Sequence, residues 1–358
     1  MATTASTVAE QVGVAQVAPG RDEFRSTSLP IRMGNVLPIA YGGCAISVAV
    51  HAAVRTAPDT HRLYSVVGHF HGPASLDQPF RIAVTRTRDT RSFATRRVRV
   101  SQLQPLSRKS TGSKTTEEGG GQQQTTTTTE RLCLELIADF HVLEEALMEF
   151  SPPLHRPHAP PSECPTRQEL QAEIEARVGH PLAVPGPFRT VQAGSERFFE
   201  LRYCRDSMSG QNLGFARDVP TDQDALPLAA RCSAEWYRVL PAREDEGGKQ
   251  QRLPVTHGEQ CAVLAFLMDG GLSFAALVHD HLGFEDAGAA SSLDFALRFM
   301  TPDVDMTRWH VRERIAHAGG AGRTYAEGRL FDEQGRLVAS MTQQGIMRPP
   351  PKKAKAAL

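Results

Sequence analysis

The same order of segments occurs twice in this chain of 358 residues, and no other feature limits its possible folds as strongly. Each half begins with a helix-like segment rich in small residues, at 42–54 in the first half and 262–277 in the second. A strand that stops at a proline follows, at 66–73 and 293–302. A segment order that repeats within one chain indicates a duplicated domain.

Long strand-like runs complete each half. They are expected at 80–86, 92–102 and 131–142 in the first half, and at 309–315, 323–331 and 337–347 in the second. A helix wrapped by such a meander of antiparallel strands is the hotdog arrangement. The sequence therefore predicts an α+β fold, a tandem or double hotdog in which two helices are each wrapped by a long antiparallel sheet.

Polar and proline-rich stretches divide the chain. Residues 105–130 contain runs of glycine, glutamine and threonine that cannot bury enough apolar surface, so we interpret them as an insertion in a hairpin. The proline-rich stretch 151–165 is interpreted as a semi-rigid linker in which His155 and His158 are solvated. The other predicted parts are a flexible N-terminus 1–20, an N-terminal hotdog 21–150, a C-terminal hotdog 166–348 and a basic tail 349–358.

Charge and cysteine usage exclude several classes of function. Forty basic residues balance forty acidic ones, which argues against nucleic acid as a partner. The longest apolar stretches are far shorter than the ~20 residues of a membrane-spanning helix, so no membrane span is expected. The six cysteines form no Cys-x-x-Cys pair, so we expect neither a metal ion nor a disulfide framework.

One helical stripe in the second half carries an unexpected charge. Spacings of three and four place one carboxylate among small and apolar residues, in the stripe Ala262, Ala265, Asp269, Leu272 and Ala276. Burial of an unpaired carboxylate is unfavourable. Asp269 is therefore either a functional residue or the end of a helix that Gly270 and Gly271 stop.

Two further candidates lie on expected strands of the second half. Alternation places Gln343 on an otherwise apolar strand face, so it is either a hydrogen-bonded core glutamine or a site residue. Ser292, at a strand start, is either a turn residue or a site residue. The chain contains no Gly-x-Ser-x-Gly elbow, no P-loop and no dinucleotide-binding Gly-x-Gly-x-x-Gly after a strand.

Several segments closely resemble the acyl-CoA thioesterase II family of bacteria and eukaryotic peroxisomes. The most specific run, at 88–98, is similar to the family's signature Arg-Asp-Gly-x-Ser-Phe-Ser-x-Arg-Arg-Val. Other similar segments are 23–28, 41–43, 77–79, 265–269, 292–294, 332–340 and 343–348. The resemblance spans roughly residues 20–348, apart from the insertions.

The resemblance implies an activity and a set of site residues. In that family an Asp on the second helix, a Thr or Ser, and a Gln near the C-terminus bind a water molecule, and these positions fall on Asp269, Ser292 and Gln343. The implied enzyme is an acyl-CoA thioesterase, a hydrolase that converts fatty acyl-CoA to free acid and CoA without a cofactor, with Asp269 as general base. A hotdog hydratase or dehydratase, and a non-catalytic acyl-binding scaffold, stay as alternatives.

Three positions depart from the family pattern. Cys44 stands where the family usually has Gln, and Met268 and Gly270 replace the usual Ser and aromatic neighbours of the Asp. These changes concern pocket shape and acyl preference. Because segment 42–54 contains no Asp or Glu, we expect catalysis only in the C-terminal half, with Cys44 or His51 as the alternative base for a second site.

The resemblance also implies a setting. We expect a role in fatty-acid metabolism in the peroxisome, because Leu358 and the upstream lysines match part of a C-terminal peroxisomal signal, although Ala357 does not. The cytoplasm is the alternative location. The expected partners are the acyl-CoA substrate and a second copy of the chain, in a dimer of double hotdogs.

Overall fold

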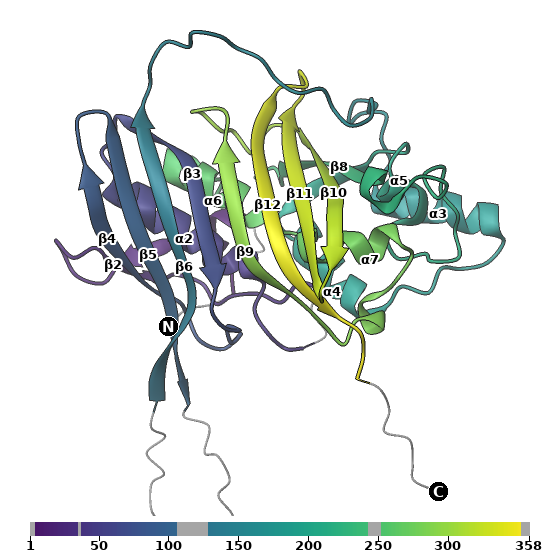
Figure 1. Ribbon diagram of the computed structural model, residues 1–358, viewed down its shortest axis with the longest axis horizontal. Coiled ribbons are helices and arrows are strands. Elements are labelled where there is room, and N and C mark those ends of the chain that lie inside the picture. Colours follow the sequence, from purple (N-terminus) through teal and green to yellow (C-terminus); the bar gives the residue numbers. More distant parts are fainter. Residues whose placement is uncertain (1–3, 35–36, 106–127, 243–251, 352–358) are drawn as a thin grey trace, which may run out of the picture.

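One antiparallel sheet of twelve strands forms the body of the computed structural model, which describes residues 4–34, 37–105, 128–242 and 252–351. The strand order is β1-β2-β4-β5-β6-β3-β9-β12-β11-β10-β8-β7, so each half of the chain supplies six neighbouring strands. The halves join where β3 pairs with β9, with Val66 opposite Leu297 (Figure 1). The prediction of a double hotdog with one continuous sheet is confirmed.

The strands are β1 (Val14–Gln16), β2 (Glu23–Ser26), β3 (His61–Phe70), β4 (Arg81–Asp89), β5 (Phe93–Pro105), β6 (Thr128–Val142), β7 (Phe199–Tyr203), β8 (Cys232–Val239), β9 (Ala289–Phe299), β10 (His310–Gly320), β11 (Arg323–Asp332) and β12 (Leu337–Arg348). The α-helices are α1 (Val8–Gln11), α2 (Gly42–Thr56), α3 (Arg167–Val178), α4 (Gly186–Glu196), α5 (Met208–Asn212), α6 (His257–Met268) and α7 (Ala275–His279). Three single turns of 3-10 helix are η1 (Leu228–Ala230), η2 (Leu272–Phe274) and η3 (Phe284–Asp286).

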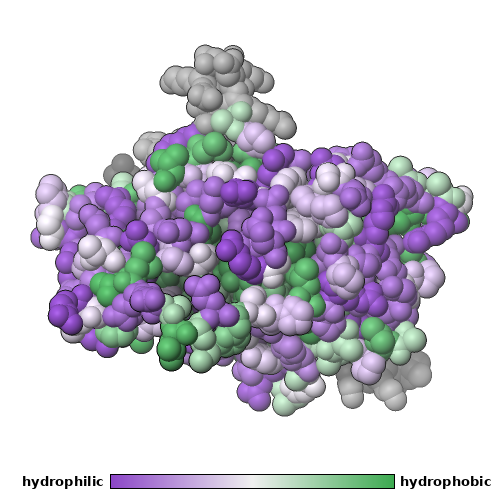
Figure 2. Space-filling view, turned by 90° about the horizontal axis from the view of Figure 1, so that it is seen from above, coloured by the Kyte–Doolittle hydropathy of each residue, from purple (hydrophilic) through white to green (hydrophobic). Residues whose placement is uncertain are grey.

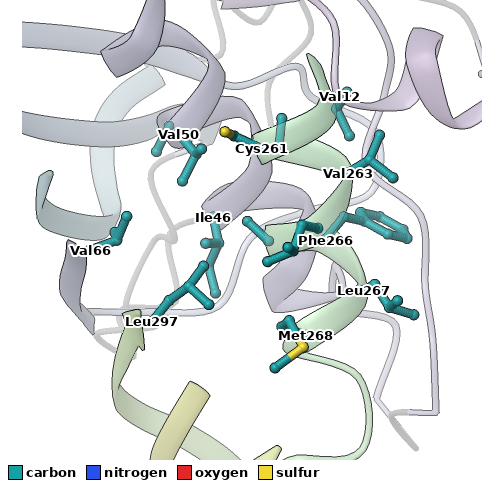
Figure 3. Close-up of a cluster of buried hydrophobic side chains, with 14 of the residues drawn as sticks. Val12, Ile46, Val50, Val66, Cys261, Val263, Phe266, Leu267, Met268 and Leu297 are labelled. Carbon is teal, nitrogen blue, oxygen red and sulfur yellow. The ribbon is translucent and has the colours of Figure 1, made fainter. Parts of the chain in front are cut away.

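The two central helices, α2 and α6, pack against each other on one face of the sheet (Figure 1). Gly43, at the start of α2, lies against the carbonyl of Phe266 near the end of α6, and Gly258 lies against Val54, so the helices run antiparallel. Between them and the sheet lies a core that includes Ile46, Val50, Val66, Cys261, Met268 and Leu297 (Figure 3). This packing brings the start of α2 to the end of α6.

The second helix is shorter than its stripe predicts. It begins at His257, after a capping box between Thr256 and Glu259, and ends at Met268. The Gly270–Gly271 pair breaks it, so Leu272 lies in η2 and Ala276 in α7 rather than on the same helix. The stripe prediction is therefore wrong for these last two members, because the helical spacing continues in the sequence across a break that glycine creates in the backbone.

The composition of residues 1–20 predicted a flexible segment, but the described part of it is ordered against the core. A capping box between Thr7 and Glu10 starts α1, and Val8 and Val12 are buried in the main core. His51 on α2 binds the carbonyl of Val12 through Nδ1 over 2.8 Å. The segment is too short to show a helical period, which explains why its apolar residues gave no signal.

The proline-rich linker covers the outer face of the second half, and the expectation that His158 is solvated is wrong. Its ring is buried, with Nδ1 2.8 Å from a carboxylate oxygen of Asp206 and Nε2 3.1 Å from one of Glu313. Trp236 on β8 donates from Nε1 to the carbonyl of Ala159 over 2.9 Å. The linker is thus fixed to the sheet by hydrogen bonds that its composition could not reveal.

Other expected segments meet the limits of the described residues. The β5–β6 hairpin pairs as far as Pro105 opposite Thr128, while residues 106–127 of the expected insertion and 352–358 of the basic tail lie outside the described ranges.

One helical stretch, His257–His279, is long and apolar enough to cross a membrane, but 72% of its most apolar window is buried inside the protein. That burial is typical of a core helix. The surface seen in Figure 2 mixes polar and apolar side chains.

Candidate active site

Asp269 lies at the C-terminal end of α6, where the chain leaves the helix. Its own backbone is helical, and Gly271 takes φ +80°, a left-handed value that favours glycine. Asp269 is nevertheless only 6% exposed. The residue therefore combines the two interpretations that the sequence left open, since it ends the helix and is also a buried carboxylate.

Both halves of the chain hold the Asp269 carboxylate. Gln343 on β12 donates from Nε2 to Oδ1 over 2.8 Å, and the backbone N–H of Gly43 on α2 also donates to the carboxylate. Gly42 permits this approach, because a Cβ there would lie 2.9 Å from Oδ2. The start of α2 is the positive end of a helix dipole, which favours a carboxylate at this place.

This environment tunes the acidity of Asp269. Burial raises the pKa of its carboxyl to about 6, although the hydrogen bonds from Gln343 and Gly43 and the nearby cation of Arg312 act in the opposite direction. The group is therefore largely ionised at neutral pH and yet more basic than an exposed carboxylate. A general base works best when its pKa lies close to the working pH.

Two serines extend the hydrogen bonds away from the carboxylate. Ser273, in η2, donates to Oε1 of Gln343 over 2.8 Å and lies 2.9 Å from the hydroxyl oxygen of Ser292 on β9. A shift of the β9–β12 register between Gln344 and Gly345 accompanies the placement of Ser292. The structure thus connects Asp269, Gln343, Ser273 and Ser292 in one series.

Ser273 was missed in the sequence, although it follows Asp269 by four residues and continues the spacing of the stripe. Ser292 was expected to contact the same water as Asp269 and Gln343, and in the structure it reaches Gln343 through Ser273. The spacing of four was a usable signal. Ser273 was overlooked because the stripe was continued from Asp269 to Leu272, at a spacing of three, instead.

A cavity of about 1130 Å³ opens beside this series. Asp269, Ser273 and Ser292 line it, and the first half contributes Tyr41 and Phe70 among others. Gln343 does not belong to the described lining residues, and both ends of its amide are engaged by neighbours. Gln343 is therefore placed to orient the carboxylate and the serine hydroxyls from behind the cavity wall.

Neither alternative base of the first half faces this cavity. Burial raises the pKa of the Cys44 thiol to about 12, so it stays protonated. Burial lowers the pKa of His51, which lines a separate cavity of about 660 Å³ near the other end of α2. Among the described residues, no three His, Cys, Asp or Glu side chains gather as metal ligands would.

Known proteins resemble the chain over almost its whole length. Family descriptions match residues 29–116 as an acyl-CoA thioesterase N-terminal domain and residues 187–347 as an acyl-CoA thioesterase C-terminal domain. Acyl-CoA thioesterase 2 of Haemophilus influenzae is 23% identical over 311 residues, which cover 86% of this chain and 87% of that protein.

Solved structures agree on the fold. An acyl-CoA thioesterase II from Mycobacterium marinum superposes with a TM-score of 0.59 at 19% identity, covering 97% of this chain and 100% of the other. A TesB protein from Mycobacterium avium subspecies paratuberculosis gives 0.61 at 17% identity, covering 96% of this chain and 98% of the other. Fold and matched domains together define a double-hotdog thioester hydrolase. The chain belongs to the acyl-CoA thioesterase II family, and its activity is the hydrolysis of acyl-CoA thioesters.

Proposed function

We propose that this thioesterase hydrolyses fatty acyl-CoA by direct attack of a water molecule that Asp269 activates. The observation that carries the proposal is the hydrogen-bonded series from Asp269 through Gln343 and Ser273 to Ser292 along the wall of a deep cavity. Asp269 and Ser292 hold the water. Gln343 is a positioning residue that orients both groups.

The proposed reaction forms one bond to the carbonyl carbon and breaks another, with a proton transfer at each step. The water oxygen bonds to the thioester carbonyl carbon while its proton passes to the Asp269 carboxylate. The carbon–sulfur bond then breaks, CoA leaves as a thiolate, and this sulfur takes up a proton, so the products are the free acid and CoA. A thiolate is a good leaving group, so no strong acid is needed.

The start of α2 is the proposed support for negative charge on the carbonyl oxygen. The first N–H groups of a helix have no acceptor within the helix. At the start of α2 the Gly43 N–H donates to the Asp269 carboxylate and the Cys44 N–H to the carbonyl of Tyr41, which leaves the Gly42 N–H for the substrate carbonyl oxygen. Donors placed where charge develops stabilise a transition state more than they stabilise the substrate. Gly42 and Gly43 also lack side chains that would keep a thioester away from this backbone.

Thiol release and rapid quenching test this mechanism. Purified protein is mixed with a fatty acyl-CoA, and a thiol reagent follows CoA release; a parallel reaction with an enoyl-CoA tests for hydration. In single turnovers quenched in acid, mass spectrometry should find no acyl group on the protein at any time. An acylated Asp269 peptide would show that Asp269 is a nucleophile and not a base, and hydration of the enoyl-CoA without thiol release would favour a hydratase.

We also propose a role in fatty-acid metabolism in the peroxisome. The support is the C-terminal sequence, where Leu358 and the upstream lysines match part of a peroxisomal signal. A fluorescent protein fused ahead of the intact C-terminus should give puncta that overlap a peroxisomal marker. A diffuse signal would instead favour the cytoplasm.

Self-association into a dimer of double hotdogs is part of the same proposal. Its support is an apolar patch on the outer sheet face, where Val67 on β3 is paired with Ile137 on β6 and Tyr64 lies nearby, all of them exposed. Sedimentation of wild type and of Ile137→Asp tests it. A wild-type chain that sediments as a monomer at micromolar concentration would refute the dimer.

A further inference from the structure

A buried cation beside the proposed base forms no ion pair with the part of the chain that the structure describes. This residue, Arg312 on β10, lines the larger cavity and is 3% exposed. Arg314 on the same strand differs, because it pairs with Glu235. Burial of a charge is unfavourable unless nearby groups compensate it, so a buried and unpaired arginine needs a reason beyond packing.

The Arg312 guanidinium contacts the chain on both sides of Asp269. Nη1 donates to the carbonyl of Leu267, two residues before the base. Gly270 follows the base, and a Cβ there would lie 3.2 Å from the same nitrogen. Nη2 lies 3.3 Å from the hydroxyl oxygen of Tyr237, whose ring centroid is 4.9 Å from the guanidinium carbon. These contacts fix the cation at the end of α6.

The first half of the chain holds the same helix end. The last carbonyls of a helix have no donor within the helix. That of Phe266 accepts a hydrogen bond from the Tyr41 hydroxyl over 2.6 Å, and the two rings meet edge to face with centroids 5.1 Å apart. Tyr41 and Arg312 thus supply donors to two successive carbonyls at the end of α6, but only Arg312 adds a charge.

The charge of Arg312 suits this place. The C-terminal end of a helix carries partial negative charge, which favours a cation and opposes a carboxylate. Asp269 caps α6 and so lies at this end. Burial has the largest effect on the pKa of the Asp269 carboxyl and raises it, whereas the cation of Arg312, together with the hydrogen bonds from Gln343 and Gly43, lowers it.

The other titratable side chains of the neighbouring elements are neutral or paired. Burial raises the pKa of one thiol and two phenols, which stay protonated, and lowers the pKa of one imidazole, which stays neutral: Cys44, Tyr41, Tyr237 and His279. The charges of Arg314 and Glu235 compensate each other. The charge available to the base therefore comes from Arg312.

We infer that Arg312 is a positioning residue of the thioesterase reaction, which fixes the end of α6 and balances the charge of the Asp269 carboxylate. The inference rests on the proposed function, in which Asp269 is the base. An ion pair in direct contact would make the carboxylate a weak base and occupy the oxygens that a water molecule must reach. A cation bonded to the helix end keeps the carboxylate ionised and occupies neither oxygen.

The pH dependence of kcat/KM tests this role. In wild type kcat/KM should decline below about pH 6, where Asp269 takes up a proton. Arg312→Met and Arg312→Gln remove the charge, and the second keeps a donor for the helix end. In both, the carboxyl takes up its proton at a higher pH, so the midpoint of the decline should rise by roughly one pH unit. Arg312→Lys retains the charge and should return the midpoint close to that of wild type. Thermal melting checks the fold of each variant.

Two controls separate charge from packing. Tyr41→Phe removes the other hydrogen bond to the end of α6 and changes no charge. Its kcat should fall by about 3- to 10-fold, while the midpoint stays that of wild type. Arg323→Met removes an exposed arginine of β11 outside the described cavity lining, and it should change neither kcat nor the midpoint.

The outcomes distinguish this inference from the function on which it rests. An unchanged midpoint in Arg312→Met and Arg312→Gln, or a rise that Arg312→Lys does not reverse, would overturn the role of Arg312 and leave Asp269 as the base. If Asp269→Asn retains wild-type kcat/KM, the proposed base is wrong, and the inference fails with it.

Discussion

The two central helices differ at their C-terminal ends, and only the end of α6 carries a side chain that can act in catalysis. The residue that caps the C-terminus of α2 is Ala57, beside the smaller cavity, whereas the residue that caps α6 is Asp269, beside the larger one. β4 and β10 occupy equivalent places in the two halves, each being the third strand from an edge of the sheet. On β4 the buried side chains include Ile82 and Val84, whereas on β10 Arg312 and Arg314 line the larger cavity. Duplication thus preserved the fold in both halves, while polar groups for a reaction gathered in only one.

The first half still contributes, since the start of α2 holds the carboxylate of the second. Asp269→Asn is the strongest test of this division. It keeps the size of the side chain and removes the base, so kcat should fall by ~10²–10⁴-fold while thermal melting shows an intact fold. Asp280→Asn, at an exposed position of the same half, is the control and should retain wild-type turnover. Near wild-type kcat in Asp269→Asn would mean that the two helix ends do not differ in chemistry.

Gly42→Ala tests whether the first half shapes the site by its lack of a side chain. The added Cβ would lie 2.9 Å from Oδ2 of Asp269, so the carboxylate must move, and we expect kcat to fall by ~10- to 100-fold. Gly320→Ala is the matched control, because nothing lies within 4 Å of a Cβ there. An unchanged kcat in Gly42→Ala would contradict a contribution of α2 to catalysis.

The pH profile sharpens the contrast between Asp269 and an ordinary carboxylate. Burial raises its pKa to about 6, and only the ionised form accepts a proton. Therefore kcat/KM should be level above that pH and fall by about tenfold per pH unit below it. A profile that stays level down to pH 4 would show that the buried carboxylate is not the base.

The outer faces of the halves differ as well, because the linker covers only the second. Burial alone would lower the pKa of His158, but Asp206 and Glu313 raise it to about 9. In the unfolded chain a histidine has a pKa of about 6.5. The protonated His158 ring therefore stabilises the fold fully below about pH 6.5, and this contribution to stability disappears as the pH rises through about 9. The melting temperature should therefore drop over this window by several degrees more in wild type than in His158→Asn. His155→Asn, in the same linker, should behave as wild type.

The smallest expected effect concerns the first half alone. Cys44 is a protonated thiol and His51 binds the carbonyl of Val12, so neither can replace Asp269. Cys44→Ala and His51→Ala, each added to Asp269→Asn, should leave the residual rate of acyl-CoA hydrolysis within about twofold. A collapse of that rate in either double variant would reveal a second active centre.

The fold was predictable because its signals are local and repeated. Strand alternation and small-residue helices survive in both halves, and they predicted eight of the twelve strands, whereas β1, β2, β7 and β8 were not predicted. Asp269 and Gln343 were detectable as polar residues within apolar patterns. The end of α6 stayed open between two interpretations, since Leu272 and Ala276 continue its period beyond the Gly270–Gly271 pair that could stop the helix.

Contacts between distant segments left no such signal. The hydroxyl of Ser273 acquires its role only when β12 brings Gln343 near, and the ring of His158 is buried only because the linker crosses the sheet. Likewise, Arg312 and Arg314 alternate along β10 like any surface pair, and only the position of α6 and the glycines after it turns them toward a cavity. Contacts of this kind depend on how distant segments pack together, so the residue pattern of a single strand cannot predict them.

The β3–β9 pairing has a consequence for how the enzyme behaves on dilution. Two separate hotdogs would meet at a rate and to an extent set by their concentration, whereas two hotdogs on one chain meet at an effective concentration in the millimolar range. The Gly43 contact to Asp269 therefore survives at nanomolar enzyme. Because the two hotdogs of one chain have separate sequences, each can change independently. A substitution at the end of α2 therefore need not occur at the end of α6 as well.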